Sequence, residues 1–78
     1  MSEDGVKFPE ETVTTLATLA APWSREVTLQ SVDHDSGLRL MRVRIKEGRS
    51  RFTIVDLDAP TAEAMVQVLQ GWLGKSVR

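Results

Sequence analysis

The chain contains no cysteine and no tyrosine, and it has a single histidine among its 78 residues. The absence of cysteine excludes a disulfide framework, a thiolate metal site and a thiol nucleophile. No serine lies in a recognisable nucleophile motif, and the chain has no glycine-rich phosphate loop. The sequence therefore predicts that the protein is not an enzyme and that it needs no cofactor.

Long apolar runs are also absent. No stretch approaches the roughly 20 residues that a membrane-spanning helix needs. The chain begins Met-Ser-Glu-Asp-Gly, which is acidic where a secretory signal peptide would be basic. We therefore expect a cytoplasmic protein with no membrane partner. The formal net charge of −1 argues against the binding of polyanions by bulk charge.

The length of 78 residues predicts one domain. We expect a disordered tail over residues 1–7, a single α+β domain over residues 8–75 and a frayed C-terminus over residues 76–78. Pro9 is typical of a helix start and Pro22 of a helix end, so a first helix is expected between them. Its apolar stripe consists of Val13, Leu16, Ala17 and Ala20, whereas its threonines weaken it intrinsically.

The stretch from Leu38 to Leu57 alternates between apolar and polar residues, which indicates two β-strands. A two-residue turn at Glu47-Gly48 would place Val43 opposite Phe52 and bury Phe52 in the core. The same register would place Arg44 opposite Arg51 on the other face. Like charges in that position are mildly destabilising, so that face is expected to be solvated or to meet anionic groups.

A preceding strand is expected from Trp23 to Val32, followed by a turn within Asp33–Gly37. A four-residue loop would mix apolar and charged side chains on each face. A three-residue loop, residues 35–37, instead sets Leu29 beside Val43 and gives Gly37 the positive φ that this turn requires. We prefer the three-residue loop, which predicts a three-stranded antiparallel meander.

A second helix is expected after Asp58, with Pro60 in its first turn and Gly74 as its C-cap. Its apolar positions follow the helical period closely; they are Ala62, Met65, Val66, Leu69, Trp72 and Leu73. The predicted fold is αβββα, with both helices packed on one face of the sheet. Trp23 and Trp72 are interpreted as core or core-edge residues.

The αβββα order resembles that of double-stranded RNA-binding domains. That family grips phosphates with a lysine-rich start of its last helix. The corresponding region here carries Asp56, Asp58 and Glu63, which would repel phosphate. The resemblance is to the order of the elements alone, and it implies no functional residue in this chain.

The sheet face opposite the helices is the predicted interaction face. It would carry Arg42, Arg44 and Arg51 beside a row formed by Val32, Leu40 and Val55, and a contiguous apolar row is typical of a contact site. Lys46 and Arg49 are candidate anion contacts.

The segment Asp33-His34-Asp35 resembles the start of a calcium-binding loop. Such a loop needs oxygen ligands at the positions that Gly37 and Arg44 occupy here, so no metal is expected.

Two functions remain open on these residues. We favour a small interaction or regulatory module whose partner is an unidentified protein or a second copy of itself, through the open sheet face. The alternative is weak binding of single-stranded nucleic acid through the basic hairpin. Residues 38–51 hold six of the ten basic residues, but the predicted open face has no aromatic side chain on which bases could stack. The sequence therefore disfavours nucleic acid.

Overall fold

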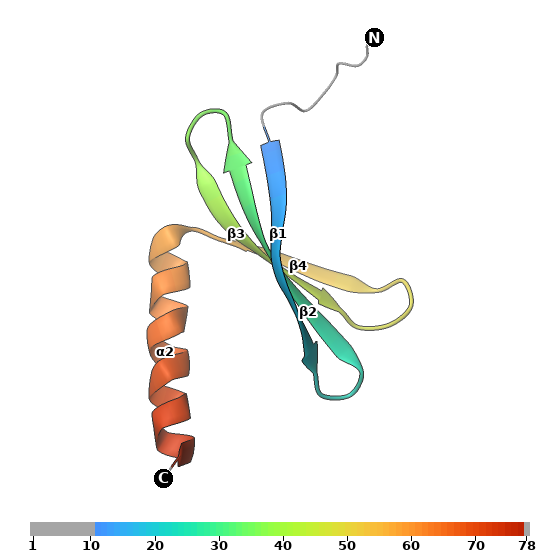
Figure 1. Cartoon of the computed structure of the whole chain (residues 1–78), viewed down its shortest axis with the longest axis vertical. Coiled ribbons are helices and arrows are strands. Elements are labelled where there is room, and N and C mark those ends of the chain that lie inside the picture. The colour runs from blue at the N-terminus through green and yellow to red at the C-terminus, as the bar shows by residue number, and fades with distance from the viewer. Residues whose placement is uncertain (1–10, 78) are drawn as a thin grey trace.

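The computed structural model describes residues 11–77, which form a four-stranded antiparallel sheet and one C-terminal helix (Figure 1). The elements are β1 (Glu11–Ala21), β2 (Arg25–His34), β3 (Arg39–Lys46), β4 (Phe52–Leu57) and α2 (Ala59–Val77), and the strands lie in chain order. The α+β class and the antiparallel sheet are confirmed. The predicted tail, residues 1–7, and residue 78 lie outside the described residues.

The first predicted helix is wrong, because residues 11–21 form strand β1. This segment is rich in β-branched residues, including Thr12, Val13, Thr14 and Thr15, which fit a pleated sheet better than a helix. β1 pairs with β2 along its length, and a bulge at Leu16 shifts the register. The order ββββα therefore replaces αβββα, and the resemblance to double-stranded RNA-binding domains is lost with it.

The hairpin between β2 and β3 is confirmed in detail. Leu29 pairs with Val43, and Val32 pairs with Leu40. The backbone N–H of Gly37 donates to the carbonyl oxygen of His34 at 2.9 Å, and Gly37 has a φ of +96°. The turn therefore uses glycine where a side chain would strain the backbone.

The predicted register of β3 and β4 is wrong by three residues. Phe52 pairs with Lys46 rather than with Val43, and Val55 takes the position opposite Val43. The connection is a five-residue loop, residues 47–51, that is closed by a hydrogen bond of 2.9 Å from the Glu47 N–H to the Arg51 carbonyl oxygen. An odd shift turns every side chain of a strand to the other face of the sheet, so Phe52 leaves the predicted core.

The sheet consequently has one apolar face and one polar face. The apolar face carries Ala17, Leu19, Val27, Leu29, Met41, Val43, Ile45, Val55 and Leu57. The polar face carries Thr15, Thr18, Thr28, Gln30, Arg42, Arg44, Lys46, Phe52, Ile54 and Asp56, together with Val13, Val32 and Leu40 near one end.

Helix α2 is confirmed, but its predicted packing is wrong. Asp58 caps it, accepting a hydrogen bond of 3.0 Å from the Thr61 N–H, and the helix continues through Gly74 to Val77. Only the start of α2 adjoins the sheet, and the rest runs beside the strands without covering them (Figure 1). The packing of two helices on one sheet face is therefore not formed.

The described residues bury little apolar surface. Val32 and Leu57 are their only buried apolar side chains. The radius of gyration is 15.8 Å, against about 11.5 Å for a compact domain of this length. The accessible surface is 6109 Å², against about 4,700 Å² for a compact monomer of this mass. Residues 11–77 thus form a sheet without the second layer that domains usually pack against it.

The conformation of the β2–β3 turn can be tested with a pair of glycine variants. Gly37→Ala should lower the free energy of unfolding by about 1–2 kcal/mol, because alanine is strained at positive φ. Gly48→Ala is the matched control: the added methyl group would lie 3.9 Å from the Cβ of Arg51, so its effect should stay within about 0.5 kcal/mol. Urea unfolding measures both, and equal effects would contradict the turn.

Candidate interaction site

An ion pair between β3 and the edge strand β4 lies on the polar face. The guanidinium of Arg42 donates through Nε to Asp56 Oδ1 at 2.9 Å and through Nη2 to Asp56 Oδ2 at 3.2 Å. The hydrogen bond from Arg42 holds the pKa of the Asp56 carboxyl below its usual value, and the same contact raises the pKa of Arg42. Such a bidentate ion pair fixes the relative position of the two strands.

The charged row continues to the other edge of the sheet. Glu11 Oε2 lies 4.0 Å from Arg42 Nη2 and 3.8 Å from His34 Nε2. Next to it, Gln30 donates from Nε2 to the hydroxyl oxygen of Thr15 at 3.1 Å. Side chains from all four strands therefore interact across this face. Arg42, one of the predicted contact residues, is already engaged by carboxylates of its own chain.

Arg44 makes a different contact. Its guanidinium carbon lies 3.9 Å from the centre of the Phe52 ring, which is cation–π geometry. Lys46 pairs directly with Phe52 across the strands, so a ring stands among the cations of the polar face. The sequence interpretation missed this ring because its register buried Phe52. One signal in the sequence favoured the observed register. It places Arg42 opposite Asp56, which attract each other, whereas the predicted register places Arg44 opposite Arg51, which repel.

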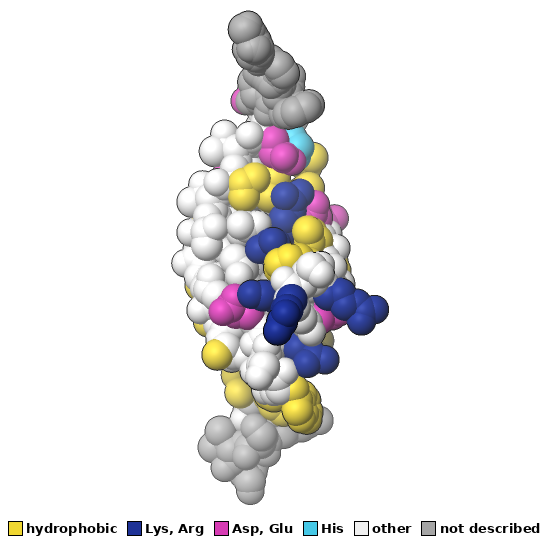
Figure 2. All heavy atoms as spheres, turned by 90° about the vertical axis from the view of Figure 1, so that its right-hand side faces the viewer, with side chains coloured by type: hydrophobic (Ala, Val, Ile, Leu, Met, Phe, Trp, Pro, Cys, Tyr) yellow, Lys and Arg dark blue, Asp and Glu magenta, His cyan; other side chains and the backbone are white. Residues whose placement is uncertain are grey.

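The remaining predicted anion contacts lie where two hairpins end. A shallow groove there is lined by residues of both hairpins: Ala20, Ala21, Ser24, Arg25 and Glu26 of the β1–β2 hairpin and Lys46, Gly48 and Arg49 of the β3–β4 hairpin. Arg51 is exposed in the same β3–β4 loop. Figure 2 shows Lys and Arg side chains gathered in the middle of this side of the molecule, flanked by carboxylates.

The predicted apolar row on this face is only partly formed. Val32 is fully buried and pairs with Leu40, which is half-buried, so these two residues do lie side by side. Val55 lies on the opposite, apolar face, because the β4 register differs from the predicted one. The predicted three-residue row therefore does not exist as a contact surface.

The larger exposed apolar surface lies on the other side of the sheet and on the helix. The middle of the apolar face is formed by Leu29, Val43 and Val55, and none of these side chains is buried. Along α2, Met65, Val66, Leu69 and Trp72 lie at helical spacing, and each is at least 45% exposed. We call these four residues the helix stripe. Exposed apolar patches of this extent mark interaction sites.

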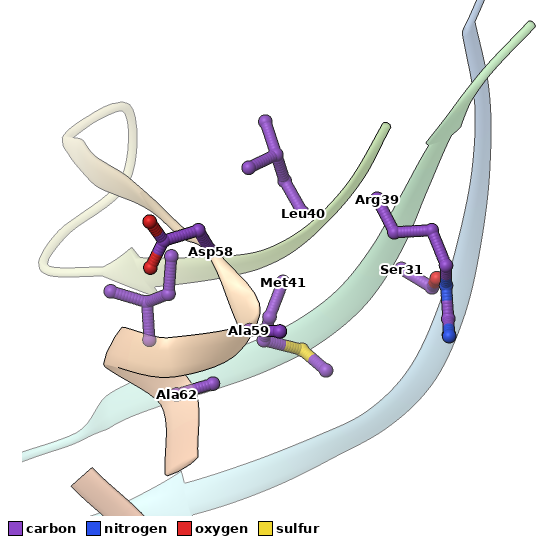
Figure 3. Close-up of a pocket in the computed structure, with 8 residues that line it drawn as sticks. Ser31, Arg39, Leu40, Met41, Asp58, Ala59 and Ala62 are labelled. Atoms are coloured by element: carbon purple, nitrogen blue, oxygen red, sulfur yellow. The ribbon is translucent and has the colours of Figure 1, made fainter. Parts of the chain in front are cut away.

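A hollow of about 230 Å³ separates the start of α2 from the sheet (Figure 3). Its wall includes Met41 and Leu57 of the apolar face and Ala59 and Ala62 of the helix. The two alanines are too short to fill it, so even the one junction between helix and sheet is incompletely packed.

A family model described as a family of unknown function (DUF6967) matches residues 10–75. The chain belongs to this family. No curated protein and no solved structure matches it. Within residues 11–77, no helix has the length and apolar character needed to cross a bilayer.

The ion pair on the polar face predicts a specific pH dependence. The folded state lowers the pKa of Asp56, so its contribution to stability is complete above the unfolded-state pKa of about 3.9 and is lost as the pH falls through the folded-state value. In Asp56→Asn, the free energy of unfolding should therefore fall less steeply as the pH is lowered. Some dependence on acid pH should remain, because Asp58 also has a lowered pKa.

Urea unfolding at a series of pH values between about 6 and 2 measures this curve. Asp35→Asn, in the exposed turn after β2, is the matched control and should behave as the parent protein does. An acid side that is as steep in Asp56→Asn as in the parent would contradict the role of the pair.

Proposed function

We propose that this protein is an interaction module that works as a homodimer, in which a second copy covers the apolar face of the sheet. The observation that supports this is the exposure, within one chain, of an apolar sheet face and of an apolar helix stripe. Each surface is what the other would normally pack against. A two-fold symmetric pair supplies one of each from both copies, so all four surfaces are covered at once.

The area supports a second copy as the occupant. The chain exposes about 1,400 Å² more surface than a compact monomer of its mass. Permanent dimers bury about 1,000 Å² or more on each partner, and their interfaces are apolar, like a divided core. The excess surface of one chain is therefore similar in area to the interface of such a dimer, and the exposed sheet face and helix stripe are apolar, as such an interface is.

The link between β4 and α2 favours an exchange of helices. Asp58 is the only residue between the end of β4 and the start of α2. Its cap and Pro60, whose φ is fixed, set the direction in which the helix leaves the sheet. The helix then extends about 28 Å beside its own strands, long enough to lie along a partner's sheet. Contact between two helices alone would leave both apolar sheet faces exposed to water.

Size-exclusion chromatography with light scattering should give the mass of a dimer across roughly micromolar to millimolar concentrations, and the melting temperature should rise with concentration. Leu29→Glu, on the apolar face, and Leu69→Glu, on the helix stripe, should each shift the protein toward a less stable monomer. Both place a charge where the partner would exclude water.

Matched controls carry the same charge on the opposite sides of the same elements. Thr28→Glu lies on the polar face of β2, and Gln67→Glu lies off the helix stripe, so both should remain dimeric. A parent protein that is monomeric at millimolar concentration would overturn the proposal. So would a dimer that survives Leu29→Glu and Leu69→Glu, since its interface would then lie elsewhere, for example on the free edge of β1.

A further inference from the structure

Each of the two hairpins that border the groove carries an exposed aromatic ring outside the groove lining. Phe52 is 40% exposed beside Arg44 and Lys46. Trp23 is 84% exposed in the β1–β2 turn, directly before Ser24 and Arg25, which line the groove. The two rings come from different hairpins, and only Phe52 is in contact with the cations; the groove lining also includes Glu26, which pairs across the strands with Lys46.

The backbone holds Trp23 in an unusual way. Trp23 has a φ of +59° and Ser24 a φ of +60°, a conformation that non-glycine residues rarely adopt. The carbonyl oxygen of Trp23 accepts a hydrogen bond of 2.8 Å from Arg25 Nη1. Positive φ at both central residues is what a two-residue hairpin turn requires, and the Arg25 N–H closes this turn by donating to the Pro22 carbonyl oxygen at 3.3 Å. The turn leaves the Trp23 ring exposed to solvent.

The cations at the end of the β3–β4 hairpin are available to a ligand. Among the described residues, Lys46, Arg49 and Arg51 make no ion pair, whereas Arg42 is bound to Asp56 and Arg39, on the other face, to Asp33. Arg44 contacts the Phe52 ring and no described carboxylate. The positive charge therefore concentrates at the hairpin ends although the whole chain is nearly neutral.

We propose that this groove binds single-stranded nucleic acid, with Lys46, Arg49 and Arg51 on the phosphates and with Phe52 and Trp23 as stacking surfaces for bases. Exposed rings interleaved with cations are the usual platform for unpaired bases, which present their flat faces to such rings. An acidic peptide would use the cations but has no need of the rings. A duplex hides its base faces from such rings. The site lies on the polar side of the sheet, opposite the proposed dimer interface, and does not depend on it.

Fluorescence anisotropy with a labelled thymidine oligonucleotide of about 15 residues tests the site. We expect binding at low salt that weakens steeply as salt rises, together with quenching of tryptophan fluorescence as bases stack on Trp23. Lys46→Gln should reduce the slope of log Kd against log salt by about 1. Phe52→Leu should weaken binding about tenfold while leaving that slope unchanged.

Arg39→Gln is the matched control, because it removes one exposed cation from the opposite face of the same strand. It should leave both affinity and slope close to those of the parent. The proposal is overturned if the oligonucleotide does not bind at low salt, or if Arg39→Gln weakens binding as much as Lys46→Gln does. Equal binding of a duplex of the same length, with no effect of Phe52→Leu, would equally overturn it, since it would show attraction by charge alone.

Discussion

The burial of apolar surface is the requirement on which this structure depends. The four-stranded sheet has one apolar face, and a sheet is stable only when a second layer excludes water from that face. The only helix among the described residues is attached to the sheet through a single residue, Asp58, and runs beside the strands. Val32 and Leu57 are the only buried apolar side chains among the described residues, so these residues do not form a second layer over the sheet. Folding and association are therefore coupled in our account.

The register of β4 separates the two surfaces to which functions are assigned. With Phe52 opposite Lys46, the sheet places Val43, Val55 and their neighbours on one side and a ring among cations on the other. The Arg42–Asp56 pair belongs to the same register and cannot form in one shifted by three residues. One pairing choice thus separates the apolar face, which we propose a second copy covers, from the polar face.

The sequence predicted the parts of the fold that have one strong local signal. The β2–β3 hairpin followed from alternation and from Gly37 in its turn, and α2 followed from its helical period. The first segment was mispredicted because its apolar residues match a helical period, while its threonines favour a strand; pairing with β2 decides between them. The β4 register was mispredicted because apolar residues stand on both of its faces, Phe52 and Ile54 on one and Val55 and Leu57 on the other.

The candidate site depended on that register and could be predicted only in part. The cations were identified from composition, but the row of Val32, Leu40 and Val55 was not, because Val55 changed face with its strand. Phe52 was excluded from the site for the same reason. Trp23 was interpreted as a core residue, since nothing in a Pro-Trp-Ser-Arg sequence marks two consecutive positive φ angles. No pattern in the sequence indicated that the described residues would leave the apolar face uncovered.

Nuclear Overhauser contacts between copies test the central claim most directly. A sample that mixes isotope-labelled and unlabelled chains reports only the contacts that pass from one copy to another. Our account predicts such contacts between the helix stripe, at Leu69 and Trp72, and the apolar face, at Leu29 and Val43. If these side chains approach one another only within a single chain, the helix covers its own sheet and the account is wrong.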